Sequence, residues 1–217
     1  MSYIYDEKIA TPLCEIMGNH NSDKGNVDII NSHHNYTTFY YSIFKDIQYS
    51  YLKIFELGIG TNNINIPSNM GENGTPGASL YGWSDFFVNS KIFGADIDSN
   101  ILFNTEKIKT FYCDQTNKDS ILNMWNNNEL NDEFDIIIED GLHTFSANVC
   151  FFENSIHKLK KTGFYIIEDI NVNDINLFHN KIEEWKLIYP NLLFEIIQIP
   201  STKNIHDNNL LLIKNIE

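Results

Sequence analysis

The sequence predicts a doubly wound α/β fold, built on a mostly parallel seven-stranded sheet that ends in an antiparallel C-terminal hairpin. Short runs of β-branched and aromatic residues alternate with helix-length segments, and this alternation places parallel strands between helices on both faces. The last two apolar runs are joined by a turn at residues 200–204, so they are close enough to pair as a hairpin. The 217 residues suffice for one domain with a full-sized core.

The expected elements follow this alternation along the chain. Residues 1–35 are polar and irregular, and an aromatic-rich helix follows at residues 36–49 with Asn35 as its cap. Buried strands are expected where β-branched and aromatic residues run together, at residues 53–57, 91–96, 110–113, 133–139, 163–168, 193–199 and 209–214. Helices are expected between them, near residues 78–88, 100, 118–127, 145–160 and 174–189.

The composition excludes two classes of partner. The formal net charge is −14, and all fifteen basic residues are lysines, so the chain lacks the basic stripe and arginine forks of a nucleic-acid binder. No stretch approaches the length of a membrane span. Residues 1–17 lack the basic start and apolar core of a signal peptide, and the three cysteines have no metal-ligand spacing. We therefore expect a cytoplasmic protein with reduced thiols that binds no nucleic acid and has no membrane span.

A glycine pair follows the first expected strand, in the run that begins at Glu56 and contains Gly58 and Gly60. Glycines at such a position let backbone N–H groups approach a ligand closely. The dinucleotide fingerprint requires a third glycine where this chain has Asn63, and an acidic residue about 20 residues further on. The next acidic strand end, Asp96, lies beyond a long loop. The pattern therefore disfavours NAD.

The order of these motifs resembles the class I S-adenosylmethionine-dependent methyltransferases, which share a Rossmann-like sheet. Asp96 ends the second strand, and Asp114 with Gln115 follows the third. The resemblance implies that Gly58 and Gly60 line the loop at the methionine end, that Asp96 binds the ribose and that Asp114 and Gln115 flank the adenine. A carboxylate suits a ribose diol because it accepts two hydrogen bonds at once. From the residues alone, the two aspartates also fit a role as loop caps after strands.

Acidic clusters end two strands that are expected to be neighbours. Glu139 and Asp140 close one of them and are followed by His143, whereas Glu168 and Asp169 close the other. The carboxyl ends of parallel strands meet at one crevice, where bare carboxylates repel unless a cation or a shared proton neutralises them. Oxygen ligands favour Mg²⁺, Ca²⁺ or Mn²⁺ over zinc. We therefore expect a hard-metal site beside a histidine, although Asp140 alone also fits the cap of the following helix.

Several short motifs spread over most of the chain occur in a characteristic order. They are Ser22-Asp23-Lys24-Gly25, the tyrosine-rich helix from Tyr36, Gly77-Ala78-Ser79-Leu80 with Trp83, Asp114-Gln115, Asp140-Gly141-Leu142-His143 and Glu168-Asp169. This order resembles the metal-dependent sugar O-methyltransferases of the macrolide (mycinamicin, macrocin) type, whose relatives act on cephalosporin precursors and bacterial surface glycans.

The narrower resemblance implies a set of site residues. Mg²⁺ would be bound by Asp140, Glu168 and Asp169, and His143 would be the general base. The residues implied at the S-adenosylmethionine site are Glu56, Gly58, Gly60, Ser79, Trp83, Asp96, Asp114, Gln115 and Glu139.

The resemblance also implies an activity, which is methyl transfer from S-adenosylmethionine to a hydroxyl of a sugar or glycan precursor, such as a nucleotide-linked sugar or a capsular polysaccharide unit. Residues 1–50 would form a lid or an oligomer contact in a homo-oligomer, and residues 51–217 the methyltransferase domain. The Pro- and Gly-rich loop at residues 62–77 departs from the family and leaves the acceptor open. The alternatives are a non-sugar acceptor, such as a phosphoramidate or a small diol, and a non-catalytic S-adenosylmethionine-binding protein.

Overall fold

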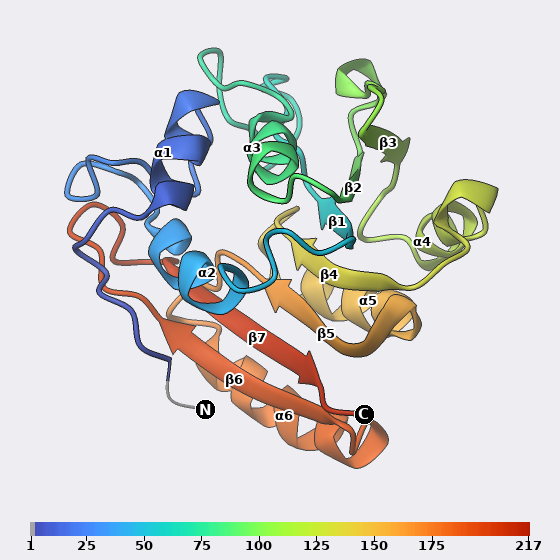
Figure 1. The fold of residues 1–217 in the computed structure, drawn as a ribbon. Helices are drawn as coiled ribbons and strands as arrows, with labels where there is room; N and C mark the ends of the chain where they lie inside the picture. The colour runs from blue at the N-terminus through green and yellow to red at the C-terminus, as the bar shows by residue number, and fades with distance from the viewer. Residues whose placement is uncertain (1–2) are drawn as a thin grey trace.

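A seven-stranded sheet forms the centre of the computed structural model, which describes residues 3–217 (Figure 1). The strand order is β3-β2-β1-β4-β5-β7-β6; the first five are parallel, and β7 runs antiparallel to both of its neighbours. The fold class expected from the sequence is therefore confirmed. The strands are β1 (Lys53–Leu57), β2 (Lys91–Asp96), β3 (Ile108–Tyr112), β4 (Phe134–Glu139), β5 (Leu159–Ile167), β6 (Leu192–Gln198) and β7 (Asn209–Asn215).

Helices cover both faces of this sheet, and each face has its own hydrophobic layer (Figure 1). One layer packs under α1 (Pro12–Asn19), α2 (Tyr36–Phe44) and α3 (Ala78–Phe86). The other packs under α4 (Lys118–Trp125), α5 (Phe145–Ser155) and α6 (Ile175–Ile188). Three short 3₁₀ segments complete the described elements, at Ser99–Ile101, Asn128–Leu130 and Ile156–Lys158. Within residues 3–217, no helix combines the length and the apolar character that a membrane crossing requires.

Helix α1 corrects the expectation that residues 1–35 are irregular. Thr11 caps it, because its hydroxyl accepts the Cys14 N–H at 3.4 Å, and Pro12 occupies the first helical position, where its fixed φ suits the helix. Leu13 and Met17 are fully buried in the layer that α1 shares with α2 and α3. The Thr-Pro pair is the signal in the sequence that marks this helix start.

Further expectations differ from the structure. The helix expected at residues 145–160 ends at Ser155, because a 3₁₀ turn and then strand β5 follow it. Helix α2 ends at Phe44 instead of residue 49, and Asn35 makes no side-chain cap bond. The Asn35 amide donates to the carbonyls of Glu7 and Pro200 at 3.2 and 3.1 Å and so ties two loops together. Strand β5 begins at Leu159, four residues before its expected start, because Leu159 pairs with Phe134 on β4 before an exposed polar stretch.

The alternation of side chains along each strand decides which acidic residues meet. Glu56 and Glu168 each follow a residue of the α4–α6 layer, so both face the layer under α1–α3. Glu139 follows Ile138, which belongs to the α1–α3 layer, and therefore faces the opposite side of the sheet. Glu56 and Glu168 thus lie on the α1–α3 side of the sheet, whereas Glu139 lies on the α4–α6 side.

The strand order places a crevice at the carboxyl ends of β1 and β4. The chain leaves β1 toward β2 and β3, then crosses back to β4 on the other side of β1, and such a switch in direction opens a ligand-binding crevice. Gly58 lies at this point with φ of 83°, and a Cβ there would come 1.8 Å from the Asp140 carbonyl oxygen. The loops after β1 and β4 therefore approach each other too closely for any side chain at position 58.

The first prediction concerns the core of the α4–α6 layer. Phe55 is fully buried and packs against the rings of Trp125, Phe134 and Phe151, with centroids 4.6, 5.7 and 6.2 Å away. We expect Phe55→Ala to lower the free energy of unfolding by about 3–5 kcal/mol in urea denaturation, because it leaves a cavity. Leu187→Ala, at a side chain that is 86% exposed, is the control and should change stability by under about 0.5 kcal/mol. Equal effects of the two changes would contradict this packing.

Candidate active site

A cavity of about 220 Å³ opens at the carboxyl ends of β1 to β4. The glycine loop after β1, the acidic ends of β2 and β3 and the turn after β4 form three sides of it. The loop at residues 60–75 and two residues of the N-terminal segment, Ser22 and Asp23, form the rest. Segments that lie far apart in the sequence, between residues 22 and 143, therefore line the same cavity.

Most residues expected at the cofactor lie on this wall. Those lining the cavity are Gly58, Gly60, Ser79, Asp96, Asp114 and Gln115, together with Asp140 and His143. Glu56, Trp83 and Glu139 lie behind the wall and are almost fully buried. The structure therefore brings two groups together: one that can contact a ligand and one that supports it.

Asp96 holds the glycine loop in place. Its carboxylate accepts the Ile59 N–H and the Asp98 N–H, both at 2.9 Å. Burial raises the pKa of Asp96, and these backbone N–H groups act in the opposite direction. Asp98 in turn accepts the Thr61 hydroxyl at 2.5 Å, so the ends of β1 and β2 are joined twice. These hydrogen bonds define the shape of the cavity wall at this end.

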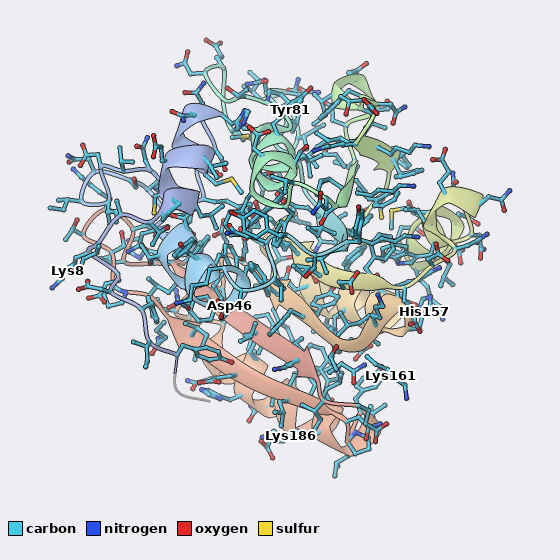
Figure 2. All side chains as sticks on the ribbon, viewed as in Figure 1. Lys8, Asp46, Tyr81, His157, Lys161 and Lys186 are labelled. Atoms are coloured by element: carbon cyan, nitrogen blue, oxygen red, sulfur yellow. The ribbon has the colours of Figure 1, made fainter. Side chains whose placement is uncertain are left out.

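A buried ammonium lies at the acidic strand ends. Lys24 is 1% exposed, and its Nζ donates to Asp140 Oδ2 at 2.6 Å and to Glu168 Oε2 at 2.5 Å, with Glu56 Oε1 at 3.4 Å. Burial alone lowers the pKa of Lys24, but the charges of these three carboxylates outweigh it and raise the pKa well above its ordinary value. In contrast, the lysines labelled in Figure 2 lie at the outer edge of the molecule and are exposed. We call Lys24, Glu56, Asp140 and Glu168 the Lys24 cluster.

Neutral donors from α2 and α3 complete the hydrogen bonding of this cluster. The Tyr40 hydroxyl donates to Glu168 Oε1 at 2.5 Å. Ser79 Oγ and Trp83 Nε1 donate to the two oxygens of Glu56, at 2.6 and 2.5 Å. Burial raises the pKa of Glu56, whereas Lys24 and these donors lower it. Among the described residues, no buried side-chain polar atom lacks a hydrogen-bond partner.

His143 faces the two aspartates at the edge of the cavity. It takes the left-handed conformation, with φ of 57°, and its Nε2 lies 3.1 Å from Asp140 Oδ1 while its Nδ1 lies 3.4 Å from Asp169 Oδ2. Burial lowers the pKa of His143, but the hydrogen bond to Asp140 and the charges of both aspartates raise it to about 10. The imidazole is therefore protonated at neutral pH as long as no other cation offsets these carboxylates.

In the described chain, two groups of side chains have donor atoms within 4.8 Å of one another, as a metal ion requires: Asp140, His143 and Asp169 at the cavity, and His33, His34 and Asp207 away from it. The two carboxylates in the group at the cavity suit a hard divalent cation. Glu168, the third ligand implied by the resemblance, is not part of this group in the described chain, since its oxygens face Lys24 and Tyr40. The two aspartates therefore fit a magnesium ion, and Glu168 contacts the site through Lys24.

A second hydrogen-bonded chain fixes the turn that carries His143. The Tyr165 hydroxyl donates to Glu139 Oε2 at 2.6 Å, and Gln115 Nε2 donates to Glu139 Oε1 at 2.7 Å. Gln115 Oε1 then accepts the Leu142 N–H at 2.7 Å. Burial raises the pKa of Glu139 well above its ordinary value, against the effect of these hydrogen bonds. Glu139 thus acts behind the wall by orienting Gln115.

The sequence predicts no site role for three residues that the structure places at the site: Lys24, Tyr36 and Tyr40. The two tyrosines are four residues apart, so they lie on one face of α2, and the Tyr36 hydroxyl donates to Asp169 Oδ1 at 2.5 Å. This helical spacing is a signal that the sequence carries. Lys24 lies in a motif that the sequence analysis quotes, but no local pattern reveals its partners.

Comparisons with known proteins find similarity to methyltransferases. No family model matches the chain. The 8-demethyl-8-alpha-L-rhamnosyl tetracenomycin-C 2'-O-methyltransferase of Streptomyces olivaceus is 24% identical over 154 residues, which are 71% of this chain and 36% of that protein. The mycinamicin VI 2''-O-methyltransferase of Micromonospora griseorubida is 27% identical over 140 residues, 63% of this chain and 32% of that protein. The chain thus spans about a third of the length of these relatives.

Solved structures show the same architecture. The MycE methyltransferase from the mycinamycin biosynthetic pathway, in complex with Mg, SAH and mycinamycin VI, has a TM-score of 0.71 at 19% identity, over 94% of this chain and 55% of that one. A complex of the same enzyme with Mg and SAH also gives 0.71. These comparisons confirm the Rossmann-like methyltransferase fold and the resemblance to sugar O-methyltransferases. The MycE complexes contain magnesium, and they give no support to manganese or calcium.

The second prediction concerns the Lys24 cluster. We expect Lys24→Met to lower the free energy of unfolding by about 3–5 kcal/mol, because it leaves buried carboxylates without their counter-ion. Combining it with Glu168→Gln should cost less than the sum of the two single changes, since the pair interact directly. Lys186→Met, at an exposed ion pair, is the matched control and should cost about 0–1 kcal/mol. Strict additivity in urea denaturation would contradict a direct Lys24–Glu168 interaction.

Proposed function

We propose that this chain is an S-adenosylmethionine-dependent O-methyltransferase that acts on a hydroxyl of a sugar or glycan precursor, with Mg²⁺ bound beside the acceptor. One observation carries the proposal. The same cavity wall runs from Asp96, the residue implied at the ribose, to Asp140 and His143. A nucleoside and a group that accepts a proton would therefore lie in one cavity. The names of the curated relatives support a sugar hydroxyl as the acceptor.

The residues on the wall fit the expected cofactor. Gly58 and Gly60 line the cavity with positive φ values of 83° and 80°, a conformation that glycine adopts readily. Asp96 offers a carboxylate to the ribose hydroxyls, and Asp114 and Gln115 line the end where the adenine would lie. Glu56, Trp83 and Glu139 serve the cofactor indirectly, by holding the wall from behind. Ser79 belongs to both sets of residues: it lines the cavity, and its hydroxyl donates to Glu56 behind the wall.

The acidic residues fit a divalent cation beside this pocket. A magnesium ion held by Asp140 and Asp169, with Glu168 as the third carboxylate implied by the resemblance, would act as a Lewis acid on an acceptor hydroxyl. Tyr36 and Tyr40 hold Asp169 and Glu168 in place through their hydroxyls. Because these tyrosines come from α2, the N-terminal segment is part of the proposed site.

His143 is the proposed general base. Asp140 and Asp169 orient its ring, and their negative charge raises its pKa to about 10 while it is not offset by a cation. When these carboxylates share their charge with a bound cation, the pKa of His143 falls back toward its ordinary value of about 6.5. The neutral imidazole could then take the hydroxyl proton near neutral pH; as the oxygen bonds to the methyl carbon, the bond from that carbon to the sulfonium sulfur breaks and S-adenosylhomocysteine leaves.

The acceptor, the cellular location and the assembly complete the proposal. The loop at residues 60–75 lines the cavity and is the segment that would select the acceptor, whether free, nucleotide-linked or part of a capsular polysaccharide. A cytoplasmic location, a homo-oligomeric assembly and a lid role for residues 1–50 stay predictions from the sequence.

The third prediction tests the activity itself. We expect S-adenosylhomocysteine to bind the protein in calorimetry, and a screen of free and nucleotide-linked sugars to yield methylated product. Phosphoramidates and small diols serve as the competing acceptor classes. Turnover of a non-sugar acceptor alone would contradict the sugar assignment, and the absence of S-adenosylhomocysteine binding would contradict the proposed cofactor.

The fourth prediction concerns metal and base. EDTA should abolish turnover and Mg²⁺ should restore it, because the hydroxyl is a poor nucleophile without a Lewis acid. His143→Ala should lower turnover by about a hundredfold or more while S-adenosylhomocysteine still binds. His179→Ala, at an exposed histidine on α6, is the matched control and should leave turnover unchanged. A near-normal rate in His143→Ala would identify another group as the base.

A further inference from the structure

We propose that Asp23 binds the ammonium group on the methionine part of S-adenosylmethionine, and that Lys24 holds Asp23 in position at the cavity wall. The inference rests on the proposed function, since it assigns a role toward the same cofactor. It concerns the segment Ser22-Asp23-Lys24-Gly25 before α2, in which the resemblance implies no cofactor-binding residue.

Glu56 is the acid that the glycine-loop pattern places near the methionine end, but it has no access to the cavity. It is fully buried and does not line the wall. Its Oε2 accepts Trp83 Nε1 at 2.5 Å, and its Oε1 accepts Ser79 Oγ at 2.6 Å with Lys24 Nζ at 3.4 Å. A ligand ammonium would have to displace these donors to reach it. A different carboxylate must therefore face the ammonium.

Four aspartates line the cavity, and three of them have partners within the chain and are assigned above to the ribose, the adenine end and the metal ion. Asp96 accepts two backbone N–H groups, Asp114 accepts the N–H and hydroxyl of Thr116, and Asp140 contacts Lys24 and His143. Asp23 lines the same cavity and is exposed, and in the described part of the chain its carboxylate makes no hydrogen bond or ion pair. It is the wall carboxylate whose two oxygens are both open to a ligand.

The position of Lys24 decides at which end of the cavity Asp23 lies. The Lys24 ammonium contacts residues at the ends of β1, β4 and β5. Asp114 and Gln115 follow β3, at the far edge of the parallel strands. Asp23, next to Lys24 in the chain, therefore lies toward the end opposite the adenine site. In S-adenosylmethionine the amino acid part extends away from the adenine, so its ammonium would point to this end.

The segment around Asp23 is fixed on both sides. The Ser22 N–H donates to the Met17 carbonyl at 3.0 Å, and the Lys24 carbonyl accepts the Thr37 N–H at 3.2 Å. The buried Lys24 side chain adds a third attachment. A carboxylate held in this way loses little conformational freedom when a ligand binds, which favours recognition of a charged group.

The charge of the wall agrees with a cationic ligand. Its acidic residues are Asp23, Asp96, Asp114 and Asp140, and no lysine of the described chain lines it. S-adenosylmethionine carries a sulfonium and an ammonium against one carboxylate, so it is a net cation. The wall thus favours it electrostatically, and Asp23 supplies the unengaged charge.

The test compares two ligands in titration calorimetry without an acceptor. S-adenosylhomocysteine carries the ammonium, whereas 5′-methylthioadenosine keeps the nucleoside and thioether but lacks the amino acid part. We expect Asp23→Asn to weaken S-adenosylhomocysteine binding by about tenfold or more, as the loss of a hydrogen bond to a charged group does, and to change 5′-methylthioadenosine binding less than about twofold. Glu15→Gln, at an exposed carboxylate on α1, is the matched control and should leave both affinities unchanged.

The possible results separate the proposals. If Asp23→Asn leaves S-adenosylhomocysteine affinity unchanged, Asp23 does not bind the ammonium, and the inference fails while the proposed function stands. If it weakens both ligands equally, with the same thermal unfolding as the parent protein, the effect is not specific to the ammonium and the inference also fails. If the parent protein binds neither ligand, the proposed function fails and the inference fails with it.

Discussion

The buried ammonium of Lys24 is the interaction on which the site depends. Glu56, Asp140 and Glu168 come from the ends of three parallel strands. Because Glu56 and Glu168 are fully buried and Asp140 is half-buried, these carboxylates would have to protonate or move apart if no cation lay among them. Lys24 supplies that cation from within the chain. A salt bridge of this kind adds little to stability compared with a well-packed apolar core, but breaking it is costly. Its main effect is to specify which segments meet.

The Lys24 cluster makes the N-terminal segment an integral part of the site. The segment contributes Lys24 to the strand ends and Asp23 to the cavity wall, and α2 follows with two tyrosines that reach the neighbouring carboxylates. On the side of the sheet under α4–α6, a separate set of hydrogen bonds links Glu139 to Gln115 and Gln115 to the turn before His143, so Glu139 orients that turn. The base is thus positioned from one face of the sheet and the acidic cluster from the other.

The sequence predicts the strands and their acidic ends well, because apolar runs and carboxylates at their ends are local patterns. It also predicts that Asp140 and Asp169 lie together, since parallel neighbours share an edge. It cannot predict the partners of Lys24, which lie 116 and 144 positions away, because nothing local distinguishes this lysine from fourteen others. The position of Glu56 behind the wall is unpredictable for the same reason. Its donors, Ser79 and Trp83, lie on α3, and the local sequence does not show where α3 packs on the sheet.

The most direct test of this account is the state of the Lys24 ammonium in protein freed of metal with EDTA. Nitrogen-15 NMR of lysine side chains detects ammonium groups that are shielded from exchange with water. We predict a protected ammonium signal at neutral pH that persists above the ordinary lysine pKa of about 10.4 and is missing from Lys24→Met. If no lysine signal is protected, or if Lys24→Met retains the same protected signal, the ammonium does not hold the acidic strand ends together.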